Sequence, residues 1–175
     1  MATTINGSAG VITNSGAVYD GLQRGTAVAS TSGTSIDFTG IPSWVKRITV
    51  MFNGVSTNGT SFPQVQLGSG SVTTSGYSSF AGFLAGANQT SASSATTGFH
   101  MNDGTTAATR FGIMTITNIT GNTWTSNHTM GDVGGTVVFS GAGSIALSAT
   151  LDRIRITTVN GTDTFDAGSI NIMYE

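Results

Sequence analysis

Residues 151–159, LDRIRITTV, alternate apolar and polar side chains over most of their length. Successive side chains of a β-strand point to opposite faces of a sheet, so this spacing places Ile154 and Ile156 on one face and Arg153 and Arg155 on the other. A period of two residues is typical of a half-buried strand, whereas a helix repeats its apolar positions every three or four residues. The stretch therefore predicts a sheet with one face on a core and the other in water.

The same period returns along much of the chain. The other strands that it predicts are 26–38, 45–52, 64–67, 111–119, 123–130, 137–139, 145–149 and 169–175. Because the last of these reaches residue 175, the C-terminus is predicted to be a paired strand rather than a tail. Tyr77, Phe80 and Leu84 have helical spacing, but the glycines among them oppose a helix of more than one or two turns.

Turn residues separate the predicted strands. Asn53-Gly54 is a typical turn pair, and residues 120–122 form the loop of a predicted hairpin between 111–119 and 123–130. Residues 141–143, Gly-Ala-Gly, are predicted to separate two further short strands. Residues 86–98, rich in Gly, Ser, Ala and Thr, are predicted to form a long surface loop.

Many short strands without an ordinary helix predict an all-β protein. An antiparallel β-sandwich with jelly-roll or Greek-key connections fits this pattern best, with residues 26–175 as one domain. Residues 1–25 carry isolated apolar residues without a period, so we expect an extended arm that is ordered against the body, another subunit or a partner. A frayed terminus is the alternative for this segment.

The composition limits the classes of partner. Charged residues make up only 8% of the chain, while Gly, Ser, Thr and Asn make up about half of it, so we expect a surface of hydroxyls and amides. A net charge of -2 without clustered Lys and Arg argues against nucleic acid as a partner. The chain has no Cys, which leaves the redox compartment open, and no apolar run that predicts a membrane span. Its start carries no secretory signal, so we expect synthesis in the cytoplasm.

Four residues are candidates for a metal site: His100, Asp103, His128 and Asp132. Imidazole and carboxylate are the right ligand types for zinc and related metals. The two His are far apart in the sequence, however, and their spacing matches no known ligand motif. We therefore expect polar surface or loop residues, and neither a metal nor a cofactor.

Catalytic patterns are also missing from the sequence. No Gly-x-Ser-x-Gly elbow joins a strand to a helix, and the only Glu is the terminal Glu175. Asp163 and Asp166 are close together, but they lie in a segment rich in turn residues. The sequence thus favours a protein that is not an enzyme.

Aromatic residues are the remaining candidates for ligand binding. Trp124 and Tyr77 are the side chains that we consider for stacking on a sugar ring, together with the predicted loop 86–98. Trp44 follows Pro42 at the start of a predicted strand, and we expect it in the core.

Two segments resemble structural proteins of tailed bacteriophages. The first is residues 33–52, GTSIDFTGIPSWVKRITVMF, and the second is residues 151–172, LDRIRITTVNGTDTFDAGSINI. The resemblance implies a β-sandwich displayed on the virion surface, commonly as a homotrimer, at the end of a tail fibre or on the capsid. Domains of this kind usually end a longer fibre chain, whereas only about 25 residues precede this one, which favours a small stand-alone protein.

Three functions remain open after the sequence. The first is a non-enzymatic capsid decoration protein or short fibre or tail tip, which docks on other virion proteins through residues 1–25 and serves host attachment or capsid reinforcement. The second is a carbohydrate-binding module that recognises a host surface glycan. The third is a small polysaccharide depolymerase, for which we expect no activity.

Overall fold

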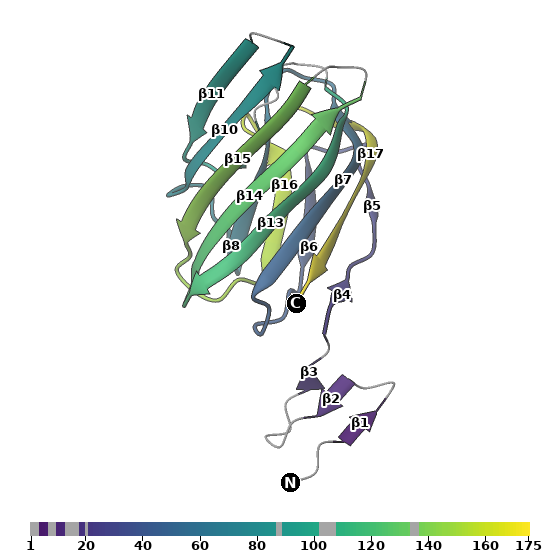
Figure 1. The fold of residues 1–175 in the computed structure, drawn as a ribbon, viewed down its shortest axis with the longest axis vertical. Coiled ribbons are helices and arrows are strands. Elements are labelled where there is room, and N and C mark those ends of the chain that lie inside the picture. Colours follow the sequence, from purple (N-terminus) through teal and green to yellow (C-terminus); the bar gives the residue numbers. More distant parts are fainter. Residues whose placement is uncertain are drawn as a thin grey trace.

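A computed structural model describes residues 4–6, 10–12, 18–19, 21–86, 89–101, 108–133 and 137–175 of the chain (Figure 1). The described strands are β1 Thr4–Asn6, β2 Gly10–Ile12, β3 Val18–Tyr19, β4 Gln23–Arg24, β5 Val28–Ala29, β6 Ser35–Thr39, β7 Arg47–Thr57, β8 Pro63–Ser69, β9 Ser71–Val72, β10 Ser78–Ala85, β11 Gln89–Ala95, β12 Phe99–His100, β13 Arg110–Thr120, β14 Thr123–Asp132, β15 Val137–Ala146, β16 Arg153–Thr158 and β17 Phe165–Tyr174. Within these ranges there is no helix, and so none that is long and apolar enough to cross a membrane.

Two antiparallel sheets pack face to face in the body of the molecule. In the described residues, the large sheet has the order β11-β10-β15-β14-β13-β7-β17-β4, with β5 also paired to β17, and the small sheet has the order β12-β8-β16-β6, with β9 paired to β8. Figure 1 shows the large sheet in front of the small one. The predicted all-β antiparallel sandwich is confirmed.

The chain crosses repeatedly between the two sheets. β6 lies in the small sheet, β7 in the large, β8 in the small, β10 and β11 in the large, β12 in the small, β13 to β15 in the large, β16 in the small and β17 in the large. Neighbours within a sheet are therefore often distant in sequence. The meander β13-β14-β15 widens the large sheet.

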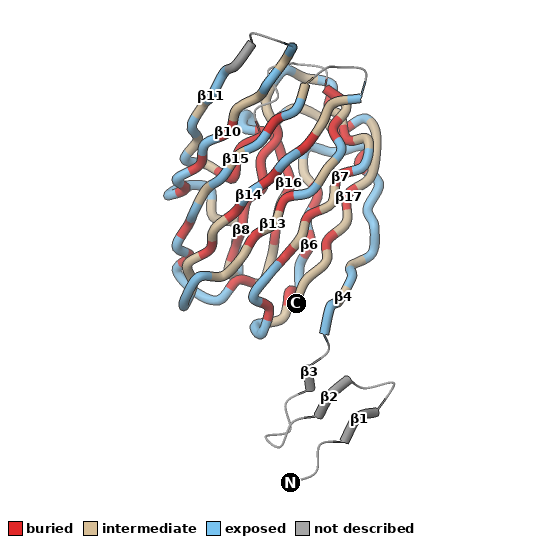
Figure 2. Tube along the Cα trace, in the orientation of Figure 1, coloured by how far each residue is buried: buried red, intermediate tan, exposed pale blue. Residues whose placement is uncertain are grey.

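The core lies between the sheets, where the inward side chains of both are buried. Ile154 and Ile156 of β16 are fully buried, as the alternation predicts, whereas Arg153 and Arg155 point away from the core. Arg155 donates two hydrogen bonds of 2.7 Å to the carboxylate of Asp37 on the neighbouring β6. The tube in Figure 2 shows buried positions alternating with less buried ones along β6 and the first part of β16.

The two ends of the body pair with each other in both sheets. β6 pairs with β16 in the small sheet, and β7 pairs with β17 in the large one. The amide of Phe165 donates to the carbonyl of Gly33, and that of Ile41 to the carbonyl of Asp152. Residues 33–52 and 151–172 thus form one continuous corner of the sandwich.

The predicted turn at Asn53-Gly54 is wrong, because both residues lie inside β7. Gly54 has φ +68° and the opposing Gly168 has φ +90°, and the register between β7 and β17 shifts at this point. Positive φ suits glycine, which has no Cβ to clash with the backbone. The pair therefore marks a β-bulge in a long strand rather than its end.

Two further predicted interruptions are strands. Residues 141–143 lie within β15, and most of the predicted loop 86–98 is β11, which pairs with β10 along its whole length. A Cβ on Gly141 would lie 2.5 Å from Cε1 of His128 and 2.6 Å from the carbonyl oxygen of Phe80. Gly141 is thus required by close packing inside the sheet, not by a turn.

The end of the predicted arm is part of the body. Gln23 and Arg24 form β4, which pairs with Tyr174 and Met173 of β17, and the amide of Gly25 donates to Ile172 at 2.8 Å. β1, β2 and β3 pair with one another in a separate sheet. Gly21 and Leu22 precede β4, and Leu22 is exposed. Residues 1–3, 7–9, 13–17 and 20 of the predicted arm lie outside the described residues.

Gly141→Ala tests the close packing inside β15. The added methyl group meets a buried ring and a neighbouring strand's backbone, so we expect a loss of about 1–3 kcal/mol in the free energy of unfolding. The matched control is Ala149→Val, at an exposed position after the same strand, which should change it by less than about 0.5 kcal/mol. Urea denaturation compares the two, and equal midpoints would refute the packing argument.

Candidate functional site

The most distinctive surface lies on the side of the large sheet that faces away from the core. We call this surface the outer face and define it by the outward side chains of β10, β15, β14, β13 and β7. It carries five large apolar side chains, each between 46% and 65% exposed: Phe80, Leu84, Phe111, Ile113 and Val138. Leu84 is directly opposite Val138, Val138 is opposite Gly131, and Gly131 is opposite Phe111, so three of the five share one row across four strands.

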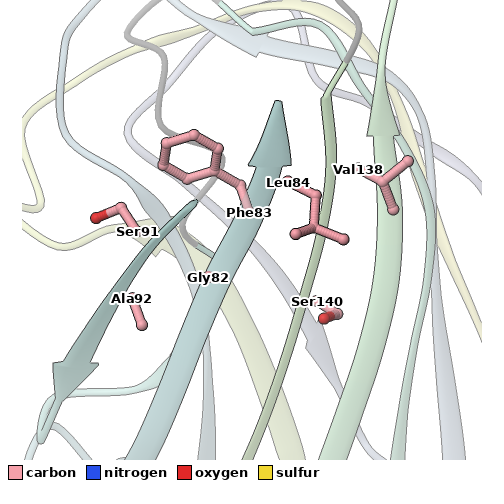
Figure 3. Close-up of a pocket in the computed structure, with 7 residues that line it drawn as sticks. All are labelled: Gly82, Phe83, Leu84, Ser91, Ala92, Val138 and Ser140. Atoms are coloured by element: carbon pink, nitrogen blue, oxygen red, sulfur yellow. The ribbon is translucent and has the colours of Figure 1, made fainter. Parts of the chain in front are cut away.

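Glycines create hollows between these apolar side chains. Figure 3 shows the first hollow, of about 400 Å³, where Gly82 lies between Leu84, Ala92 and Ser140. A second hollow, of about 460 Å³, lies over Gly112 and Gly131. Val138 lines both hollows and forms the ridge between them.

Charged side chains are confined to the margins of the outer face. Of the described residues in the five strands that form it, Arg47, Arg110 and Asp132 carry charge, and each is the first or last residue of its strand. Arg110 is also buried. Between these margins the outward residues are apolar, small or neutral and polar.

The small sheet presents a surface of different chemistry. A cleft of about 280 Å³ is lined by amides, hydroxyls and the guanidinium of Arg155. The Thr97 hydroxyl donates to Oε1 of Gln64 at 2.8 Å, and Nε2 of Gln66 donates to the Thr97 carbonyl at 2.8 Å. We call this the polar cleft; its walls are fixed by hydrogen bonds between segments far apart in sequence.

His100 and His128 lie inside the sandwich rather than at its surface, so the expectation of polar surface or loop residues is wrong for this pair. The Ser93 hydroxyl lies 2.7 Å from Nε2 of His100, and the His128 ring packs against Phe139 with 6.2 Å between ring centroids. Nδ1 of His100 and Nε2 of His128 are buried without a hydrogen-bond partner. Burial lowers the pKa of both rings, that of His128 to about 4, and the nearby His100 contributes to the lower pKa of His128.

The other two metal candidates do not join this pair in the described residues. Asp132 accepts the backbone N–H of Thr109 at 2.8 Å, at the end of β14. Asp103 lies outside the described residues. Among the residues that are described, no group of three or more His, Asp or Glu side chains is placed to hold a metal ion.

The aromatic candidates Tyr77 and Trp124 are both core residues. The Tyr77 hydroxyl accepts the amide of Leu67 at 2.7 Å, its ring meets Phe99 edge-on, and burial raises the pKa of Tyr77 to about 12. Neither ring can stack on a sugar at the surface, so this suggestion from the sequence is wrong. Trp44, which we expected in the core, is 42% exposed and lies beside Tyr174.

Sequence reasoning missed the outer face, although one signal of it was present. Residues 111–114, Phe-Gly-Ile-Met, place apolar side chains on both faces of a strand, and so do residues 137–139, Val-Val-Phe. A sheet with one face in water normally alternates apolar and polar positions. Apolar residues on both faces indicate a second apolar surface on the side of the sheet away from the core.

A comparison of the sequence with known protein families and with characterised proteins finds no match.

The burial of His100 and His128 predicts that the free energy of unfolding depends on pH. The pKa of His128 is lower in the folded than in the unfolded protein, so the unfolded state binds the proton first and stability falls as the pH drops from about 6.5 towards 4. Between pH 7 and pH 5 we expect His128 to cost about 2 kcal/mol of the free energy of unfolding. Urea titrations at both pH values measure the loss.

His128→Met is the matched variant for this pH dependence. A neutral side chain of similar size cannot take up a proton, so the difference between pH 7 and pH 5 should shrink to what His100 still contributes. A variant as pH-dependent as the wild type would show that His128 is not the responsible group.

Proposed function

We propose that this chain is a non-enzymatic structural protein of a tailed-bacteriophage virion, displayed on the particle surface as a homotrimer. It acts as a capsid decoration protein or as a short fibre or tail tip, for capsid reinforcement or host attachment. One observation carries the proposal. The two segments that resemble phage structural proteins, residues 33–52 and 151–172, are paired strands in both sheets and so form one structural unit.

The chemistry of the surface supports this role. A protein on a particle outside the cell meets changing salt, and a surface of hydroxyls and amides depends less on ionic strength than a charged one. Only 8% of the residues are charged. Among the ion pairs, that of Arg155 and Asp37 is bidentate. Without Cys, the stability comes from the packed core and from assembly.

The pairing of β4 limits the docking segment that we propose. Because Gln23 and Arg24 already pair with the C-terminal strand, the docking segment of the proposal is the part of residues 1–25 that precedes them. Deletion of residues 2–20 removes this segment and leaves every strand pair of the body in place.

Particle incorporation tests the docking segment. We expect the variant that lacks residues 2–20 to fold, with an unchanged β-type circular dichroism spectrum, but to be absent from purified particles. Mass spectrometry of particles that carry the full-length or the truncated chain measures this. Full incorporation of the truncated chain would refute docking through the N-terminal segment.

The copy number in the particle separates the two versions of the role. A number of copies comparable to that of the major capsid protein indicates a decoration protein. A number far below it indicates a fibre or tail tip.

The polar cleft favours a second candidate function, the recognition of a host surface glycan. Sugars are bound through hydrogen bonds to amides, hydroxyls and charged groups, and these groups line the cleft around Gln66, Thr157 and Arg155. The guanidinium of Arg155 is held by Asp37, which fixes its direction at the cleft wall. In this function the cleft takes the place of Trp124 and Tyr77.

Arg155→Ala tests glycan recognition at the cleft. For a glycan found on an array, loss of a charge-assisted hydrogen bond should weaken binding by about tenfold or more. Arg153→Ala is the matched control, because Arg153 lies on the same face of β16 but does not line the cleft. An array without hits, or equal binding by both variants, would refute this function.

A further inference from the structure

We infer that the outer face binds a second copy of this chain and is the subunit interface of a homo-oligomer. The inference rests on the homo-oligomer of the proposed function and adds the surface that forms it.

The outer face leaves several large apolar side chains exposed to water. Phe80, Leu84, Phe111, Ile113 and Val138 each leave about half or more of their surface in water, and they gather on one side of one sheet. Apolar patches of this kind on a soluble protein mark sites that another molecule covers. Burial against an apolar partner surface removes this area from water and drives association.

The distribution of charge selects a second copy as the partner. The charged residues of the five strands, Arg47, Arg110 and Asp132, lie at strand ends and leave the middle neutral. A neutral surface offers no complementary charge to nucleic acid or to a strongly charged protein. Two copies of the same neutral surface, in contrast, meet without repulsion between like charges and without the cost of removing a charge from water.

The size of the outer face matches what a stable interface needs. Five strands spaced about 4.8 Å apart, with about ten residues each at about 3.3 Å per residue, span roughly 800 Å². A standard protein interface buries about 800 Å² on each partner. One such face per subunit is therefore large enough to hold a specific oligomer together.

The shape of the outer face is suited to interlocking. Val138 lines the hollow at Gly82, which Figure 3 shows, and also the hollow over Gly131, so it forms a ridge between the two. Phe80 and Leu84 project from β10 beside the first hollow. In a homotrimer each interface joins two different parts of this face, so the ridge of one copy can enter a hollow of the next copy around the three-fold axis.

Ser140→Arg tests the inference in the full-length protein. Ser140 is an exposed, outward residue in the middle of β15 and lines the first hollow, so an arginine there places bulk and charge in the interface without touching the core. The matched control is Ser148→Arg, an equally exposed position in the connection that follows β15. Light scattering after size exclusion at micromolar concentration gives the oligomeric state, and circular dichroism checks the fold.

We expect an oligomer for the wild type and for Ser148→Arg, and a folded monomer for Ser140→Arg. A monomeric wild type would overturn both the homo-oligomer and this interface, whatever the result for incorporation into particles. An oligomeric Ser140→Arg would overturn this interface alone. If Ser140→Arg lost incorporation into particles but kept its oligomeric state, another virion protein would cover the face, and the inference would again fail.

A milder variant keeps the test valid if Ser140→Arg fails to fold. Val138→Thr keeps the branched shape of the side chain and replaces one methyl group of the ridge by a hydroxyl. Since every subunit brings the substitution into the interface, we expect the oligomer to dissociate at about tenfold higher protein concentration. An unchanged dissociation curve would contradict the inference.

Discussion

The pairing of β6 with β16 and of β7 with β17 links early and late segments of the body in both sheets. These pairs join segments more than a hundred residues apart. Closing such long loops costs chain entropy, which apolar burial has to offset. The buried Ile154, Ile156 and Ile170 supply the apolar burial that offsets this cost, which makes the corner of residues 33–52 and 151–172 the element on which the other strands depend.

Two surfaces of opposite chemistry follow from this closed sandwich. The outer face of the large sheet is apolar and neutral, whereas the small sheet carries the polar cleft and the pair of Arg155 and Asp37. A molecule built in this way can assemble through one side and recognise a ligand through the other. Separate surfaces allow the proposed assembly and display functions to coexist without competition for the same residues.

Two imidazole side chains are buried between the sheets. His100 and His128 come from different sheets and approach each other only because the sheets stack, and Gly141 leaves room for the His128 ring. Burial keeps both imidazoles neutral at pH 7, since their pKa values are lowered. The two histidines therefore couple the stability of the sandwich to acidity.

The sequence by itself determined the strands whose side chains alternate, because a period of two residues is local: Ile154 and Ile156 are buried, and Arg153 and Arg155 are not, as their spacing indicates. Glycine positions, in contrast, were ambiguous in the sequence, because glycine occurs in turns, in bulges and at sites of close packing. Only the neighbouring strands decide that Gly54 lies in a bulge and that Gly141 packs against the ring of His128. The burial of Trp124, the exposure of Trp44 and the outer face were likewise decided by tertiary structure, because which side of a strand meets water depends on what packs against it.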